Sequence, residues 1–288
     1  MIVQNLEPSR RNRWLHWLSN AESVYQHVGW HPVAYWLGRP VSLCLQKSDG
    51  TETASLLVCP DRFDVAWLHL FAADAFPGAQ MAWELLWPAA SETLRAIGVD
   101  RVWVMTTQSW FAALVRESGF QYAGHVVALM QTPALNPDAA GNDGRVVPIR
   151  EADLPAIEIL DHAAFGIPWQ MDSDALRETR NRSILATAFR SEGRILGYQM
   201  TVPTAQGVHL ARLAVDPSRQ RQGIGRLLTA HLLRYFGQRG APRVTVNTQA
   251  ENESSLRLYR SLGFQPMGDD YPVYCCTLAE VRSGSFGK

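Results

Sequence analysis

The chain has 288 residues, a length that suits two domains of about 140 residues each. Lysine plus arginine number 27, as do aspartate plus glutamate, so the charge does not favour a nucleic acid or another polyanion as partner. No apolar run reaches the roughly 18 residues of a membrane helix, so we expect no membrane partner.

The first 40 residues hold four of the ten tryptophans, and we expect them to form helices added to the first domain. Turn-forming residues become dense between Gln131 and Arg145, where eight of the 15 residues are proline, glycine, asparagine or aspartate. We therefore predict a first domain over residues 1–132, a linker over 133–145, and a second domain over 146–288.

The second domain shows a clear succession of elements. A strand at 146–149 precedes a helix that begins near Asp153 and a second helix at 173–182. Three strands are expected at 184–189, 195–202 and 208–215, with a hairpin turn at 191–194. A helix at 225–237, a strand at 244–247, a helix at 253–262 and two final strands, near 264 and at 271–277, complete the domain.

The first domain repeats parts of the second at nearly constant spacing, about half the chain apart. Residues 71–74 match 213–216, residues 101–104 match 243–246, and residues 115–120 match 259–264. The first two matches lie 142 positions apart and the third lies 144 positions apart. Such agreement indicates two copies of one fold.

A glycine-containing loop joins the strand at 208–215 to the helix at 225–237. Glycines at 223 and 225 let backbone N–H groups approach an anion, and the helix start adds its dipole. Arg221 and Arg226 add positive charge. A dinucleotide fingerprint would need a third glycine where Leu228 stands, and no Gly-Lys-Ser/Thr follows, so we interpret the loop as another kind of phosphate cradle.

These residues resemble the acyl-CoA motif of the GNAT superfamily of N-acyltransferases. The match consists of Gln220-x-x-Gly223-x-Gly225 preceded by residues 213–217, together with Asn252 and residues 255–264 downstream. The resemblance implies an α+β (mixed α/β) fold, with two tandem GNAT-like domains that each have a mostly antiparallel, twisted central sheet flanked by helices. It also implies acetyl-CoA as cosubstrate.

The resemblance assigns roles to particular residues. Backbone groups of Leu213, Ala214 and Val215 would pair with the pantetheine amides, and Asn252 would hydrogen-bond the cofactor arm. Tyr259 would be the general acid that protonates the departing thiolate. The CoA pyrophosphate would bind to Gln220, Arg221, Gln222, Gly223, Ile224, Gly225 and Arg226.

The general base is left open by the sequence. Many relatives carry a glutamate five residues before the motif asparagine, but Asn247 stands at that position and cannot take a proton. His209 is one candidate, Glu251 and the acidic residues near 172 and 174 are others, and a chain of water molecules is an alternative. Phe165 and Trp169 are expected to line the acceptor site.

The first copy has lost the residues of the motif. Met81 and Trp83 stand opposite the two glycines, and Val115 stands opposite Tyr259. We expect a scaffold that resembles, in architecture, tandem GNAT proteins with one degenerate copy.

The expected activity is transfer of an acetyl or short acyl group to a primary amine, with a small molecule as acceptor. Two alternatives remain: a non-catalytic acyl-CoA-binding sensor, or an acetyltransferase acting on a protein amine. Four cysteines without Cys-x-x-Cys spacing favour reduced thiols, a cytoplasmic location and no metal site. The oligomeric state stays open.

Overall fold

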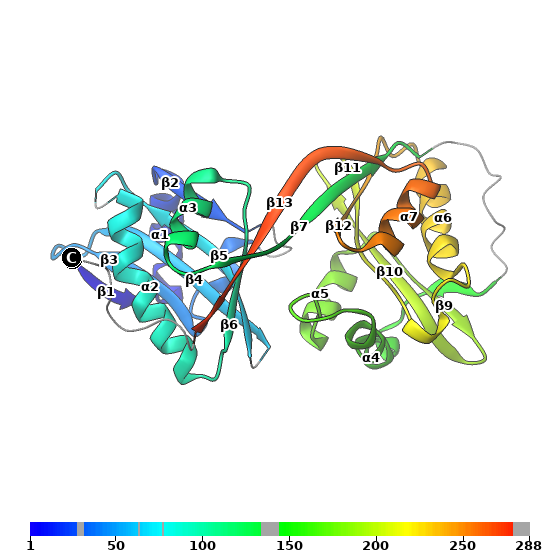
Figure 1. The fold of residues 1–288 in the computed structure, drawn as a ribbon, viewed down its shortest axis with the longest axis horizontal. Coiled ribbons are helices and arrows are strands. Elements are labelled where there is room, and N and C mark those ends of the chain that lie inside the picture. Colours follow the sequence, from blue (N-terminus) through cyan, green and yellow to red (C-terminus); the bar gives the residue numbers. More distant parts are fainter. Residues whose placement is uncertain (28–31, 63, 77, 134–143, 279–288) are drawn as a thin grey trace. The chain divides into compact units, whose positions relative to one another are not determined.

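The structure is a computed structural model that describes the chain apart from residues 28–31, 63, 77, 134–143 and 279–288 (Figure 1). Most of the expected linker at 133–145 lies outside the described residues. The chain forms two compact units, and their composition differs from the division expected at the linker. Unit 1 comprises Met1–Gly124 and Tyr271–Lys288, and unit 2 comprises His125–Asp270.

The two units differ from the sequence repeats because each takes a strand from the other copy. The strand β7 (Gln121–Gln131) continues from the first copy and pairs with β12 (Val244–Gln249) in unit 2. Its counterpart β13 (Gln265–Thr277) is one strand, where two had been expected, and its last residues pair with β6 (Arg101–Met105) in unit 1. Because the two copies have the same fold, a last strand can pair with the equivalent edge of either copy. The sequence alone does not show which of the two edges it pairs with.

Unit 1 is an α+β layer built on one twisted sheet. Its sheet follows the order β1-β3-β4-β5-β6-β13, with β2 paired to β5. The strands are β1 (Ile2–Asn5), β2 (Ser23–Gln26), β3 (Val41–Gln46), β4 (Glu52–Arg62) and β5 (Val65–Ala73). The helices are α1 (Arg11–Leu18), α2 (Gly78–Ala96) and α3 (Ser109–Glu117), with short 3₁₀ turns η1 (Pro8–Arg10) and η2 (Val33–Trp36).

The first 40 residues correct one expectation, because they contain strands as well as helices. β1 extends the sheet by pairing with β3, and β2 pairs with the second half of β5. The four-residue segments of these strands lack the apolar alternation that marks a longer strand, so only the partner strands reveal them. On α2, buried Trp83, Leu86, Trp87 and Ala90 recur at helical spacing and pack on the sheet.

Unit 2 has the same plan, with the strand order β7-β12-β11-β10-β9-β8. The remaining strands are β8 (Val146–Pro148), β9 (Leu185–Ser191), β10 (Arg194–Thr204) and β11 (Gly207–Val215). The helices are α4 (Leu154–Ala164), α5 (Ser173–Arg182), α6 (Ile224–Gly237) and α7 (Glu253–Ser261), with η3 (Glu151–Asp153) and η4 (Pro217–Arg219).

Helices cover both faces of the unit 2 sheet (Figure 1). α4 and α5 pack on the face that presents Tyr198 and Met200. α6 and α7 pack on the opposite face, where Val208 and Val246 are buried. β11 is an inner strand of the sheet, between β12 and β10. Its C-terminal end therefore lies close to the loop before α6 and to α7.

The repeat appears in the strand registers. In unit 1, β5 and β6 are parallel with Ala66 opposite Val102, and in unit 2, β11 and β12 are parallel with Val208 opposite Val244. Both residues of the second pair lie 142 positions after those of the first, as the sequence matches predict. The fold is therefore a mixed α/β repeat, as expected.

Candidate active site

The loop between β11 and α6 is exposed from Pro217 to Gly223. Arg221 and Gly223 both have left-handed backbone conformations, with φ of 62° and 84°, while Gln222 lies between them. Left-handed residues of this kind occur in the backbone concavities whose N–H groups bind anions. A Cβ added to Gly223 would meet no heavy atom within 4 Å, so the space beside the loop is open.

The charge around this loop is positive. The first turn of α6 contains no acidic residue to offset the helix dipole. Arg219, Arg221 and Arg226 are exposed, and within the described residues none of them lies within ion-pair distance of a carboxylate. Arg226 donates instead to Ser261 Oγ of α7 at 2.9 Å. The loop therefore suits a diphosphate.

β11 separates from β12 after a short stretch of pairing. The two strands pair only over Val208–Leu210, and no strand among the described residues pairs with the rest of β11 on that side. Asp216 N donates to Leu196 O of β10, so by alternation the backbone groups of Leu213 and Val215 point away from β10. Within the described part of the chain, Val215 O accepts one long hydrogen bond, at 3.4 Å from Gln220 Nε2.

Three of the expected segments converge at the start of α6. A Cβ at Gly225 would lie 3.3 Å from Leu258 of α7 and 3.6 Å from Val215 of β11. The glycine therefore lets the loop, the open strand and α7 come together, and Ile224 behind it is buried. The structure places the residues expected to bind the cofactor on neighbouring elements.

Asn252 is the N-cap of α7. Its Oδ1 accepts from Ser255 N at 3.1 Å and from Ser254 Oγ at 3.0 Å. The cap uses the carbonyl oxygen, and the amide nitrogen forms no hydrogen bond within the described part of the chain. That amide is available to a cofactor carbonyl.

Tyr259 lies on α7 with its ring packed against Phe264, at 5.4 Å between centroids. The side chain is 4% exposed, and burial raises the pKa of its phenol above the ordinary value. The hydroxyl forms no hydrogen bond with any described residue. It therefore keeps its proton throughout the neutral range and has capacity to donate it.

His209 lies on the face of β11 opposite Tyr259, because its neighbours Val208 and Leu210 share a core with that tyrosine. Its Nδ1 lies 2.8 Å from Thr245 Oγ1. Burial lowers the pKa of His209 to about 4, so the ring is neutral at pH 7 and weakly basic. Asn247 is exposed on β12, two residues beyond Thr245.

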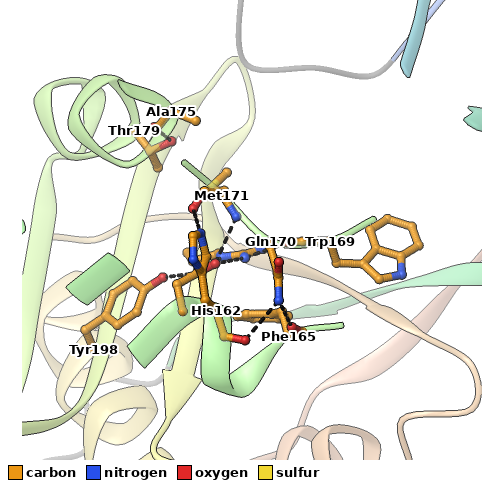
Figure 2. Close-up of polar contacts among 10 residues, drawn as sticks. His162, Phe165, Trp169, Gln170, Met171, Ala175, Thr179 and Tyr198 are labelled. Carbon is orange, nitrogen blue, oxygen red and sulfur yellow. Dashed lines mark hydrogen bonds and ion pairs between the residues drawn. The ribbon is translucent and has the colours of Figure 1, made fainter. Parts of the chain in front are cut away.

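The segment between α4 and α5 holds the expected acceptor residues, Phe165 and Trp169. It is fastened by hydrogen bonds to Asp161, His162 and Arg212. Figure 2 shows the contact of His162 with Met171 of this segment. Sequence reasoning missed Asp161 and Arg212. One feature of the sequence could have indicated Asp161: it directly follows Leu160 and lies four residues after Ile157, so it falls on the apolar face of the helix.

In unit 1 the matching strand edge is closed. β2 pairs with Leu70–Ala73 of β5, the positions that correspond to the open end of β11. Tyr25 of β2 is buried, stacks on Phe111 at 4.1 Å, and donates to Met105 O at 3.1 Å. Met105 corresponds to Asn247 by the 142-residue repeat, so the tyrosine lies at the counterpart of the candidate site in unit 2.

Among the described residues no group of three His, Cys, Asp or Glu side chains could hold a metal ion. Within the same residues, no helix is both long and apolar enough to cross a membrane.

Residues 154–264 match the acetyltransferase (GNAT) family. The chain is 30% identical over 116 residues to the ribosomal protein bS18-alanine N-acetyltransferase of Escherichia coli (strain K12), covering 40% of this chain and 77% of that protein. It is 29% identical over 189 residues to the mycothiol acetyltransferase of a Nocardioides species, covering 56% and 64%.

A solved tandem GNAT protein from the clavulanic acid biosynthesis pathway shares the fold. It aligns over 96% of this chain and 98% of its own, with a TM-score of 0.66 and 13% identity. At that identity the likeness concerns the fold alone.

Proposed function

The chain belongs to the acetyltransferase (GNAT) family and is an acyl-CoA-dependent N-acyltransferase, and on that premise we propose that it transfers acetyl from acetyl-CoA to a primary amine of a small molecule. The family uses acetyl-CoA as cosubstrate. The observation that carries the proposal is the open edge of β11 beside the cationic loop of residues 217–223.

Cofactor binding in this proposal uses backbone groups more than side chains. The pantetheine amides pair with the N–H and C=O groups of Leu213 and with the C=O of Val215, all of which point to the open edge. The Val215 N–H, which points the same way, is left for the reacting carbonyl. The pyrophosphate lies against the N–H groups at Arg221–Gly223 and the start of α6. The Asn252 amide donates to the pantetheine arm.

The reaction is an attack by the neutral amine on the thioester carbonyl. A C–N bond forms, and the oxyanion of the tetrahedral intermediate accepts a hydrogen bond from the Val215 N–H. The C–S bond then breaks, and Tyr259 gives its proton to the leaving thiolate. The amine loses its extra proton to water, and the tyrosine recovers a proton from solvent.

No strong base is needed on the protein in this scheme. The pKa of the His209 ring is about 4, far below that of an alkylammonium group, so the ring is a poor base for deprotonating the acceptor. Asn247 cannot titrate. The amine therefore enters neutral or loses its proton through water, and the reaction becomes faster as the pH approaches the pKa of the acceptor.

The choice of a small acceptor is supported by the similarity to the mycothiol acetyltransferase. That match covers 56% of this chain, whereas the match to the bS18-alanine N-acetyltransferase covers 40%. The second candidate is a protein N-terminal amine, since the bS18 enzyme is named for acetylating an alanine of a ribosomal protein. The proposal treats unit 1 as a scaffold and includes a cytoplasmic location, which suits four cysteines that carry thiols.

The test is a screen of amines with acetyl-CoA, in which release of the CoA thiol is followed colorimetrically. Small primary amines are compared with a short peptide that begins with alanine, and the Gly223→Glu protein serves as blank. We expect thiol release with one or more small amines. Turnover with the peptide alone would transfer the proposal to protein acetylation, and binding of acetyl-CoA without any turnover would support a sensor.

A further inference from the structure

A buried ion pair between Asp161 and Arg212 fastens the segment 165–172 between α4 and α5. Asp161 of α4 is 0% exposed, and the side chain of Arg212 on β11 is 10% exposed. The residues are 51 positions apart in sequence. Neither is among the residues that bind acyl-CoA in the proposal above.

The Asp161 carboxylate accepts four hydrogen bonds, two on each oxygen. Arg212 donates through Nε to Oδ2 and through Nη2 to Oδ1, each at 2.7 Å. The Met171 N–H donates to Oδ1 at 2.9 Å, and the Tyr198 hydroxyl donates to Oδ2. The paired geometry is the strong, bidentate kind.

Arg212 links the cofactor strand to the segment. It lies one residue before Leu213, and its Nη2 also donates to Trp169 O at 2.6 Å. Its guanidinium lies 3.6 Å from the centroid of the Phe165 ring. One side chain thus contacts both residues that the sequence places at the acceptor site.

The rest of the segment is held through its main chain. Gln170 Nε2 donates to His162 O and Phe165 O, each at 2.9 Å, and His162 Nε2 lies 2.9 Å from Met171 O. In Figure 2 the Trp169 indole points away from this cluster, whereas the Tyr198 hydroxyl points into it. The backbone of Trp169 is therefore fixed by the cluster, while its half-buried ring extends away from it.

Stability alone is a weak reason for this arrangement. Burying two charges is costly, and apolar side chains of similar size often stabilise a core as well. A bidentate pair instead fixes position and orientation. It also cancels the arginine charge, which would otherwise repel a cationic amine as it approaches.

We propose that Asp161 and Arg212 are positioning residues for the acceptor amine. They hold Phe165 and Trp169 at the acceptor site and fix their position relative to β11, the strand that binds the pantetheine arm. This inference rests on the proposed function, because it assumes that an amine binds at this segment. Neither residue touches the reacting atoms. Their effect is on how well the amine is placed.

The test compares Asp161→Asn with Glu151→Gln in the full chain. Asparagine keeps the shape of the carboxylate but cannot accept both arginine bonds, whereas Glu151 is an exposed carboxylate before α4 that is paired with Arg177. The probe is the amine with the highest turnover in the screen. We expect KM for that amine to rise ~10-fold or more in Asp161→Asn, with acetyl-CoA affinity within about twofold.

Hydrogen exchange supplies a second readout that needs no acceptor. The amides of residues 165–172 should exchange faster in Asp161→Asn, while those of 220–230 stay unchanged. If that variant does not fold, Arg212→Lys replaces it, because lysine keeps the charge but cannot bond Asp161 and Trp169 O together while stacking on Phe165.

Unchanged acceptor KM together with unchanged exchange over 165–172 would overturn the inference. That outcome leaves the proposed function intact, provided the unmodified protein turns over the amine. Failure of the unmodified protein to turn over any amine sinks the proposed function itself.

Discussion

Replacing Tyr259 by phenylalanine separates catalysis from packing at the site. The ring packs against Phe264 in the core of unit 2, and phenylalanine preserves that contact. The hydroxyl has no hydrogen-bond partner among the described residues, so its removal should change the free energy of unfolding by less than about 1 kcal/mol. Only the proton donor is lost.

The expected effect on turnover is large by comparison. General acid catalysis contributes roughly 10² or more in rate, which corresponds to about 2.7 kcal/mol of transition-state stabilisation. Since burial raises the pKa of the phenol, Tyr259 stays protonated over the neutral range, and its own titration should not change the rate there. The loss in Tyr259→Phe should therefore be nearly independent of pH.

The assay measures kcat by thiol release and acetyl-CoA affinity by calorimetry for both proteins. Tyr235→Phe is the matched control, because Tyr235 lies on α6 and contacts Arg239 rather than the site. We expect kcat to fall ~10²-fold for Tyr259 and to stay unchanged for the control. Full activity in Tyr259→Phe, or a loss of cofactor affinity as large as the loss of kcat, would refute the assignment.

Gly223→Glu should abolish measurable acetyl-CoA binding, because it places a side chain and a negative charge where the pyrophosphate belongs. Gly240→Glu is its control, since Gly240 also has positive φ and open space but follows the far end of α6; equal losses in both variants would show a strain effect only. The rate should rise with pH along the titration of the acceptor, since burial lowers the pKa of His209 to about 4 and Asn247 does not titrate. An apparent pKa that stays fixed between two amines of different pKa would indicate an enzyme base, and His209→Ala would then identify or exclude it.

Local signals in the sequence predicted unit 2 well. The helix at 173–182 has the expected bounds, because Asp172 caps it by accepting from Ala175 N at 2.7 Å. The turn at 191–194 forms through left-handed Glu192 and Gly193, as expected of a tight hairpin. The two glycines of the loop before α6 were visible as a pattern, and the structure gives each a reason: Gly223 has a left-handed φ of 84°, and Gly225 lets Leu258 and Val215 come close.

Long-range pairings were not predictable in the same way. β7 pairs with β12 and β13 pairs with β6, each with the strand of the other copy. β6 and β12 are corresponding strands of the repeat, so their sequences do not show which partner each of them has. The segment that forms β2 is four residues long, and its role depends on the strand edge it meets. Asp161 and Arg212 likewise have meaning only as a pair, which the fold brings together across 51 positions.

The most direct test of the account is the number of acetyl-CoA molecules that one chain binds. Unit 2 has an open strand edge, a cationic loop and available backbone donors, whereas β2 and Tyr25 close the corresponding edge in unit 1. Calorimetric titration of the full chain should therefore give a stoichiometry near one, and Gly223→Glu should remove that single site. A stoichiometry near two, or a site that survives in Gly223→Glu, would contradict the account.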